Sequence, residues 1–99
     1  MEFTSPSNVG FTVYSKSCCN NCSKIKKLLH EKAKKYNLID CDDYIIEDKP
    51  SFLLFINKVA GVDVKVFPIV FHNGTFIGSY NETKDYIEKI TCFDNNLTF

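Results

Sequence analysis

Five cysteines are the most reactive side chains in this sequence of 99 residues, and three of them are clustered. Cys19 and Cys22 are separated by two residues, a spacing that suits thiol-disulfide exchange because the second thiol can attack a mixed disulfide formed on the first. An apolar run before them predicts a strand, and the region from Asn21 to about Lys35 predicts a helix. Because the positive end of a helix dipole favours a thiolate, we expect Cys19 to be the nucleophile and Cys22 the resolving thiol.

A Cys-x-x-Cys pair is also half of a zinc site, and cysteine is often only a small buried apolar residue. Zinc would need two further ligands, and the remaining candidates are not paired at short ligand spacing: Cys41, Cys92, His30 and His72. Redox chemistry is therefore favoured, and no metal is expected. Cys18 lies four residues before Cys22 and could also be considered as the nucleophile. Cys19 is preferred for that role because only two residues separate it from Cys22. Cys41 is expected to be a buried, inert thiol, Cys92 an exposed one, and both histidines solvated rather than catalytic.

Several short elements must hold this thiol pair in place. Strands are expected at residues 11–14, 36–41, 69–71 and 75–77, the last two forming a hairpin through the Asn73-Gly74 turn. Residues 42–48 read as a polar connection, after which a helix has Pro50 in its first turn and ends near Gly61. A last helix is capped by Ser79 or Asn81, and residues 94–99 read as a frayed tail.

Length and composition limit the classes of protein that fit. We expect one domain over residues 1–99, with a core of about 10–92 and short disordered termini. Twelve lysines balance twelve acidic residues, so no nucleic-acid partner is indicated. No apolar run approaches the about 20 residues of a membrane span, and the first ten residues lack the pattern of a secretion signal. A cytoplasmic monomer without membrane contact is therefore expected.

Three segments resemble the glutaredoxin family. Residues 11–22 resemble its strand that ends in Tyr-Ser-Lys and is followed by Cys-Pro-Tyr-Cys and a Lys-rich helix. Residues 66–71 resemble the family's Thr-Val-Pro strand start, and residues 76–82 resemble its Ile-Gly-Gly-x-x-Asp glutathione loop. The resemblance spans residues 10 to 90 and implies the thioredoxin fold, an α/β fold of order β-α-β-α-β-β-α. Its four-stranded mixed sheet is flanked by helices.

The resemblance also implies a function. The protein would be a glutathione-dependent thiol-disulfide oxidoreductase that reduces protein or glutathione-mixed disulfides, with glutathione as co-substrate and disulfide-containing client proteins as partners. Lys16 would meet a glutathione carboxylate, the Phe67 backbone would pair with the tripeptide, and Pro68 would be cis. The remaining glutathione-binding residues implied are Asn21, Gly78, Ser79, Tyr80 and Asn81.

The sequence departs from the family pattern near the thiols. Asn20 and Asn21 replace Pro and Tyr between the cysteines, Ser79 replaces the second Gly of the glutathione loop, and Phe67 replaces Val. Two alternative functions therefore stay open. One is an iron-sulfur carrier in which Cys19 and glutathione from two chains ligate a cluster. The other is a redox-linked partner-binding protein that needs no glutathione.

Overall fold

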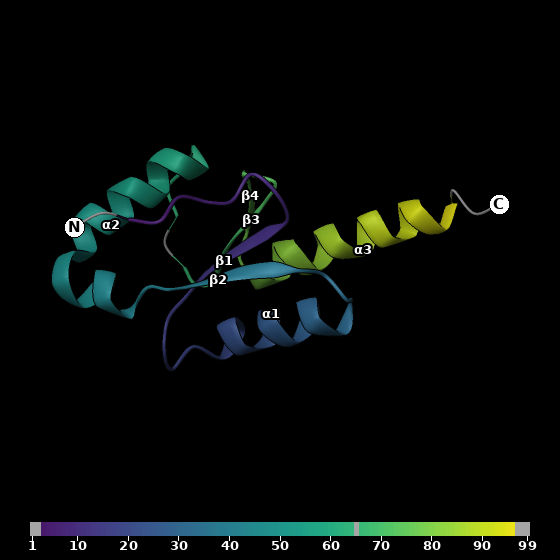
Figure 1. Cartoon of the computed structure of the whole chain (residues 1–99), viewed down its shortest axis with the longest axis horizontal. Coiled ribbons are helices and arrows are strands. Elements are labelled where there is room, and N and C mark those ends of the chain that lie inside the picture. The colour runs from purple at the N-terminus through teal and green to yellow at the C-terminus, as the bar shows by residue number, and fades with distance from the viewer. Residues whose placement is uncertain (1–2, 65, 97–99) are drawn as a thin grey trace.

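The computed structural model describes residues 3–64 and 66–96. Its strands are β1 (Phe11–Ser15), β2 (Tyr36–Asp40), β3 (Ile69–His72) and β4 (Thr75–Gly78). Its helices are α1 (Asn20–Glu31), α2 (Asp42–Ala60) and α3 (Tyr80–Asn96). The strands form one sheet in the order β2-β1-β3-β4, in which β1 is parallel to β2 and antiparallel to β3, and β3 is antiparallel to β4 (Figure 1). The predicted mixed sheet and the predicted order of elements are confirmed.

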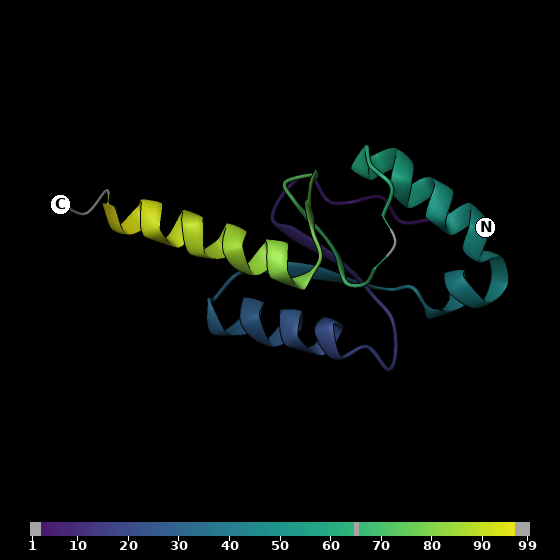
Figure 2. The ribbon, with the colours of Figure 1, turned by 180° about the vertical axis from the view of Figure 1, so that it is seen from behind.

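Alternation of side chains along the strands gives this sheet two apolar faces, and helices cover both. One buried cluster joins the sheet to α1 and α3; its members are Phe11, Val13, Ile25, Leu29, Val70 and Ile87. The other joins the sheet to α2 and contains Tyr14, Cys41, Phe52, Ile56, Val64, Ile69 and Phe71. Figure 2 shows α1 and α3 running side by side, with α2 well separated from both. None of the described helices is long and apolar enough to span a membrane.

The second helix begins earlier than the sequence indicated. Residues 42–48 were expected to be a polar connection, but they are helical except at Asp48, whose φ of −157° and ψ of 69° break the helix. The Asp48 carboxylate accepts a hydrogen bond from the Ser51 N–H at 3.3 Å and so restarts the helix with Pro50 in its first turn, as predicted. The partly buried Tyr44 ring packs against Phe3 and Phe52, and these contacts explain why the acidic segment folds against the core.

The first helix is shorter than expected. It ends at Glu31, whereas the sequence indicated an end near Lys35. Ala33 has a φ of 55°, so the chain turns out of the helix there and leads directly into β2. Ala33 therefore lies outside the helix.

Both ends of the described chain are more structured than the sequence indicated. Phe3 lies in the aromatic cluster of α2, and the Tyr14 hydroxyl donates to the Thr4 carbonyl at 2.6 Å. At the other end α3 continues through Asn96, so residues 94–96 are helical rather than frayed. Residues 97–99 and the side chain of Cys92 lie outside the described part of the structure, so the prediction for Cys92 stays a prediction.

Candidate active site

Cys19 occupies the N-cap position of α1, where the loop after β1 turns into the helix. Its backbone is extended, and its sulfur accepts a hydrogen bond from the backbone N–H of Cys22 at 3.2 Å. A cap side chain holds a helix start through such a bond, and here the acceptor is a partly exposed sulfur. Because backbone N–H groups and the positive end of the helix dipole attract negative charge, this position favours the nucleophilic thiolate.

The two neighbouring thiols are placed differently. Cys22 is 2% exposed, and burial, together with its hydrogen bond to Cys19, raises its pKa to about 11. Cys22 is therefore protonated at neutral pH and lies behind the N-cap sulfur. Cys18 is exposed, but it precedes the helix and has a φ of 55°. Only Cys19 combines exposure with the helix start, which is the geometry expected of the nucleophile.

Lys16 and Phe67 come together at the end of the sheet where β1 is followed by the thiol loop, residues 16–19. The Lys16 Nζ lies 5.6 Å from the centroid of the Phe67 ring. The peptide bond between Phe67 and the buried Pro68 is cis, as expected. Because Ile69 pairs with Tyr14 of β1, Pro68 lies beside the segment that leads to Lys16.

A second group of predicted residues forms the start of α3. Gly78 is buried with a φ of 144°, and a Cβ atom there would lie 2.6 Å from the Glu82 Cβ, so only glycine fits. The Ser79 N–H donates to the Glu82 carboxylate at 2.9 Å, which is the returning half of a capping box. The Tyr80 ring lies 5.9 Å from the Lys24 Nζ and so connects this group to α1.

The structure thus divides the predicted glutathione-binding residues between two places. The group at the end of β1 consists of Lys16, Phe67 and Pro68. The group at the start of α3 consists of Gly78, Ser79, Tyr80 and Asn81. Asn21 belongs to neither group, because it is exposed in the first turn of α1. The contact between Lys24 of α1 and Tyr80 of α3 connects the second group to the helix that carries Cys22.

The sequence did not indicate the Ser17–Asp42 clamp, which is the pair of hydrogen bonds that holds the thiol loop to the start of α2. The Ser17 N–H donates to the Asp42 carboxylate at 2.8 Å, and the Ser17 hydroxyl bonds its second oxygen. These bonds lower the pKa of Asp42 and hold the loop before Cys19 to the start of α2. The available signal was position: Asp42 follows a strand that runs parallel to β1, so the two strands end at the same edge of the sheet.

The other cysteine and histidine predictions have mixed outcomes. Cys41 is fully buried, and burial raises its pKa to about 12, so the predicted burial is confirmed and the predicted inertness stays a prediction. His30 is exposed, as expected. His72 is less solvated than expected, because its ring stacks on Phe11 with centroids 4.3 Å apart and its Nδ1 lies 2.5 Å from the Tyr86 hydroxyl.

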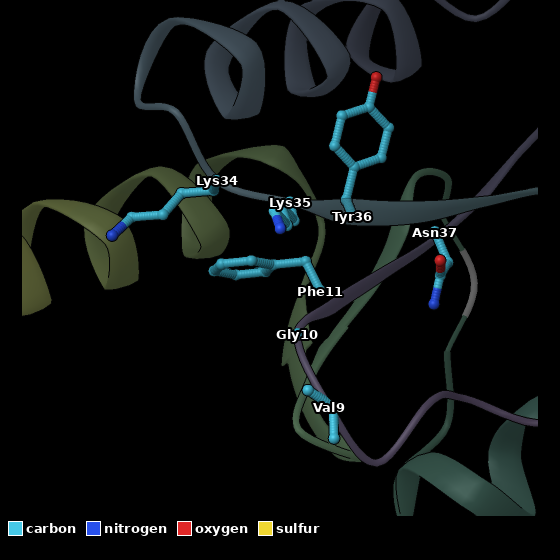
Figure 3. Close-up of a pocket in the computed structure, with 7 residues that line it drawn as sticks. All are labelled: Val9, Gly10, Phe11, Lys34, Lys35, Tyr36 and Asn37. Atoms are coloured by element: carbon cyan, nitrogen blue, oxygen red, sulfur yellow. The ribbon is translucent and has the colours of Figure 1, made fainter.

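Two cavities lie at opposite ends of the sheet. The α2 groove, of about 270 Å³, adjoins Lys16 and Phe67. Its other lining residues are Ile45, Lys49, Leu53, Asn57, Asp63 and Val64. The opposite-end cavity, of about 510 Å³, is lined by Val9, Gly10, Phe11, Lys34, Lys35, Tyr36 and Asn37. Figure 3 shows Lys34 and Lys35 alongside the Phe11 ring, with the Tyr36 ring directed away from it. Within the described residues, no three His, Cys, Asp or Glu side chains gather as a metal-binding group.

Comparison with known proteins identifies the relatives of this chain. The family model for glutaredoxin matches residues 11–77. The bovine (Bos taurus) protein glutaredoxin-2, mitochondrial, is 31% identical over 77 residues, which cover 78% of this chain and 46% of that protein. The human (Homo sapiens) protein of the same name is 32% identical over 71 residues, which cover 72% of this chain and 41% of the relative. The chain therefore spans about half the length of the curated relatives it matches.

Solved structures show the same fold. Glutaredoxin 1 from Francisella tularensis, complexed with cacodylate, superposes with a TM-score of 0.71 at 22% identity, covering 82% of this chain and 94% of that one. The buckwheat glutaredoxin-glutathione complex superposes with a TM-score of 0.66 at 25% identity, covering 81% of this chain and 69% of that one. The thioredoxin-like arrangement expected from the sequence is confirmed by this likeness.

Proposed function

The chain belongs to the glutaredoxin family, and from that premise we propose that it is a glutathione-dependent thiol-disulfide oxidoreductase. The observation that carries the proposal is the pairing of a partly exposed Cys19 at the helix N-cap with a buried, protonated Cys22 one turn later. This arrangement supplies one nucleophile and one proton-bearing resolving group. We propose that its substrates are protein disulfides and glutathione-mixed disulfides.

In the single-thiol route, the Cys19 thiolate attacks the glutathione sulfur of a mixed disulfide. A Cys19–glutathione disulfide forms, and the client cysteine leaves as a thiolate that takes a proton from water. A second glutathione thiolate then attacks the sulfur of the bound glutathione. This step releases the Cys19 thiolate and glutathione disulfide, so one client disulfide is reduced for each glutathione disulfide formed.

In the two-thiol route, the Cys19 thiolate attacks a client disulfide directly and becomes linked to one client cysteine, while the other client cysteine leaves as a thiolate that takes a proton from water. Cys22 must lose its proton before it attacks the Cys19 sulfur and releases that client cysteine. Burial, the largest cause of the raised pKa of Cys22 in the free dithiol, also favours its protonated form at this stage, so loss of the proton must precede the attack. Two glutathione molecules then reduce the Cys19–Cys22 disulfide and leave as glutathione disulfide.

Glutathione binding is proposed from the two groups of residues described above. Glutathione carries two carboxylates, which suit the Lys16 ammonium at one end and the positive N-terminus of α3, after Gly78, at the other. The Phe67 backbone would pair with the tripeptide between them, and Ser79, Tyr80, Asn81 and Asn21 would complete the site. The buckwheat relative was solved as a glutathione complex, which supports the assignment.

We also propose that the protein acts as a monomer in the cytoplasm. The described thiols are all free, namely Cys18, Cys19, Cys22 and Cys41. The proposed reaction needs Cys19 as a free thiolate, and a reducing compartment such as the cytoplasm maintains free thiols, which supports the proposed location.

The test is glutathione-dependent reduction of a small glutathione-mixed disulfide by the wild type and three variants. Cys19→Ser should abolish turnover, while Cys18→Ser, the matched control, should retain most of it. Cys22→Ser should retain turnover on the small substrate, because glutathione resolves it, but should lose direct reduction of a protein disulfide. Equal losses in Cys18→Ser and Cys19→Ser would overturn the assigned nucleophile, and turnover that does not depend on glutathione would overturn the co-substrate.

A further inference from the structure

The α2 groove has a mainly apolar wall. Ile45 and Leu53 from α2 face Val64 and Phe67 from the segment before β3 across it. Phe67 is held in place because its ring stacks on the buried Phe52, with centroids 6.3 Å apart and planes 12° apart. The volume of about 270 Å³ is smaller than the roughly 300–1,000 Å³ of sites for whole small-molecule ligands. It therefore suits one or two side chains of a peptide.

The polar rim of the groove favours negative charge. Asp63 and Asn57 are joined to each other by a 3.2 Å hydrogen bond, and Asn57 also accepts from the backbone of Val64, so these two groups serve the local fold. Lys16 and Lys49 also line the groove. The ion pair found among the described side chains is Lys27–Glu31 on α1, so Lys16 and Lys49 together leave the rim net positive beside the single Asp63 carboxylate.

Exposed apolar side chains gather on the same elements. The large hydrophobic residues that are more than half exposed include Ile46, Leu54, Val62 and Val66, with exposures of 53–79%. Each is the chain neighbour of a residue that lines the groove. Exposed apolar side chains on the elements that form a groove favour a surface that contacts another protein.

We propose that the α2 groove selects client proteins in which the segment beside the reacting cysteine carries an apolar side chain and an acidic side chain. The apolar side chain enters between Leu53 and Phe67, and the acidic one pairs with Lys49. The groove adjoins Lys16, so a client whose sulfur meets Cys19 runs past it. This inference rests on the proposed exchange chemistry and adds to it the class of client.

Short peptides with one cysteine test the selection directly. Each is supplied as its mixed disulfide with the chromophore 2-nitro-5-thiobenzoate, and transfer of the peptide to Cys19 of the Cys22→Ser variant is followed by release of the coloured thiol. The peptide with Leu and Asp beside its cysteine should react about 10-fold faster than those with Ser and Asp, Leu and Lys, or Ser and Ser. That ratio corresponds to about 1.4 kcal/mol.

Groove variants then locate the preference. Leu53→Ser should remove the advantage of Leu over Ser, and Lys49→Glu should remove or reverse the advantage of Asp over Lys. The matched control is Lys58→Glu, also exposed on α2 but outside the groove lining, which should leave both preferences unchanged. Thermal denaturation of each variant shows that it is folded, and the two groove variants test the proposal separately.

The outcomes separate this inference from the proposed function. If the wild type does not turn over a small glutathione-mixed disulfide, the proposed function itself fails. If it does, but the four peptides react at equal rates, the client selection is wrong. A preference that survives both Leu53→Ser and Lys49→Glu, or that is lost equally in Lys58→Glu, also overturns the assignment to the groove.

Discussion

The two ends of the sheet differ in what they can do, although both carry lysines and a cavity. At the carboxyl end of β1, a partly exposed cysteine caps a helix beside a groove of about 270 Å³. At the other end the cavity is larger, about 510 Å³, but Lys34, Lys35 and Phe11 line it together with uncharged groups and no cysteine. The comparison shows that the candidate reactive thiol lies where a helix begins, and not beside the larger cavity.

The topology explains this asymmetry. Because β1 and β2 are parallel, α1 and α2 both begin at the end where these strands finish. The positive ends of two helix dipoles therefore meet near Cys19, where they favour a thiolate and anionic substrates. The C-terminus of α1 lies toward the opposite end, and Lys34 and Lys35 follow it closely in the chain. Lysines in that position offset the negative end of the dipole, which is a structural role.

The largest expected contrast is between two glycines. Gly78 precedes α3 with a φ of 144°, and a Cβ there would come within 2.6–2.8 Å of Glu82 side-chain atoms. Gly74, in the hairpin turn at the opposite end, has a φ of 84°, and its added Cβ would lie 3.3 Å from the movable Asn8 side chain. Gly78→Ala should cost about 3 kcal/mol of unfolding free energy, and Gly74→Ala about 1–2 kcal/mol.

Urea denaturation measures both costs, and steady-state kinetics on a small mixed disulfide complete the comparison. Gly78→Ala should also raise the Michaelis constant for glutathione, because it displaces the start of α3, whereas Gly74→Ala should leave that constant unchanged. Equal costs for the two variants would show that the close approach of Glu82 is not what requires glycine at position 78.

Charge reversal at each end sharpens the electrostatic contrast. Lys16→Glu should raise the Michaelis constant for glutathione about 10-fold and slow alkylation of Cys19, because it places a negative charge beside Phe67 and the thiol loop. The matched variant Lys35→Glu, which faces the opposite-end cavity, should change either quantity by less than about 2-fold. If both variants weakened glutathione equally, the effect would reflect net charge and not a site at Lys16.

Much of this arrangement was predictable from the sequence because local signals and tertiary packing agree. Short apolar runs and the Asn73-Gly74 turn identified the strands, and Gly61 ends α2 with a φ of 77° in a left-handed C-cap, as expected. The Cys19–Cys22 spacing identified the thiol pair for the same reason: its position between a strand and a helix is a local property. Such features need no knowledge of distant parts of the chain.

The features that were missed depend on contacts between distant segments. The Ser17–Asp42 clamp, the stacking of His72 on Phe11 and the groove between α2 and Val64 each join residues far apart in sequence. The helical segment before Asp48 was missed because its acidic residues stand out in the sequence, whereas the packing of Tyr44 on Phe3 and Phe52 appears only in the folded chain. Local pattern therefore located the predicted nucleophile, while packing determined what surrounds it.

The smallest expected contrast is in the pH dependence of folding stability. His72 at one end of the sheet and Asp42 at the other should lose their contributions over different pH ranges. Burial, aided by the charge of Lys34, lowers the pKa of His72 below its usual 6.5, so in acid the unfolded chain takes up this proton before the folded one does. The stability that His72 contributes is therefore fully present above pH 6.5 and is lost as the pH falls from there toward the folded pKa.

At the other end, the Ser17 hydrogen bonds lower the pKa of Asp42 below 3.8, so the stability that Asp42 contributes is present above pH 3.8 and is lost only below that value. Urea denaturation at a series of pH values should show that His72→Phe flattens the loss below pH 6.5 and leaves the acid limb intact, while Asp42→Asn flattens the acid limb alone. A single loss shared by both variants would mean that the two ends do not titrate independently.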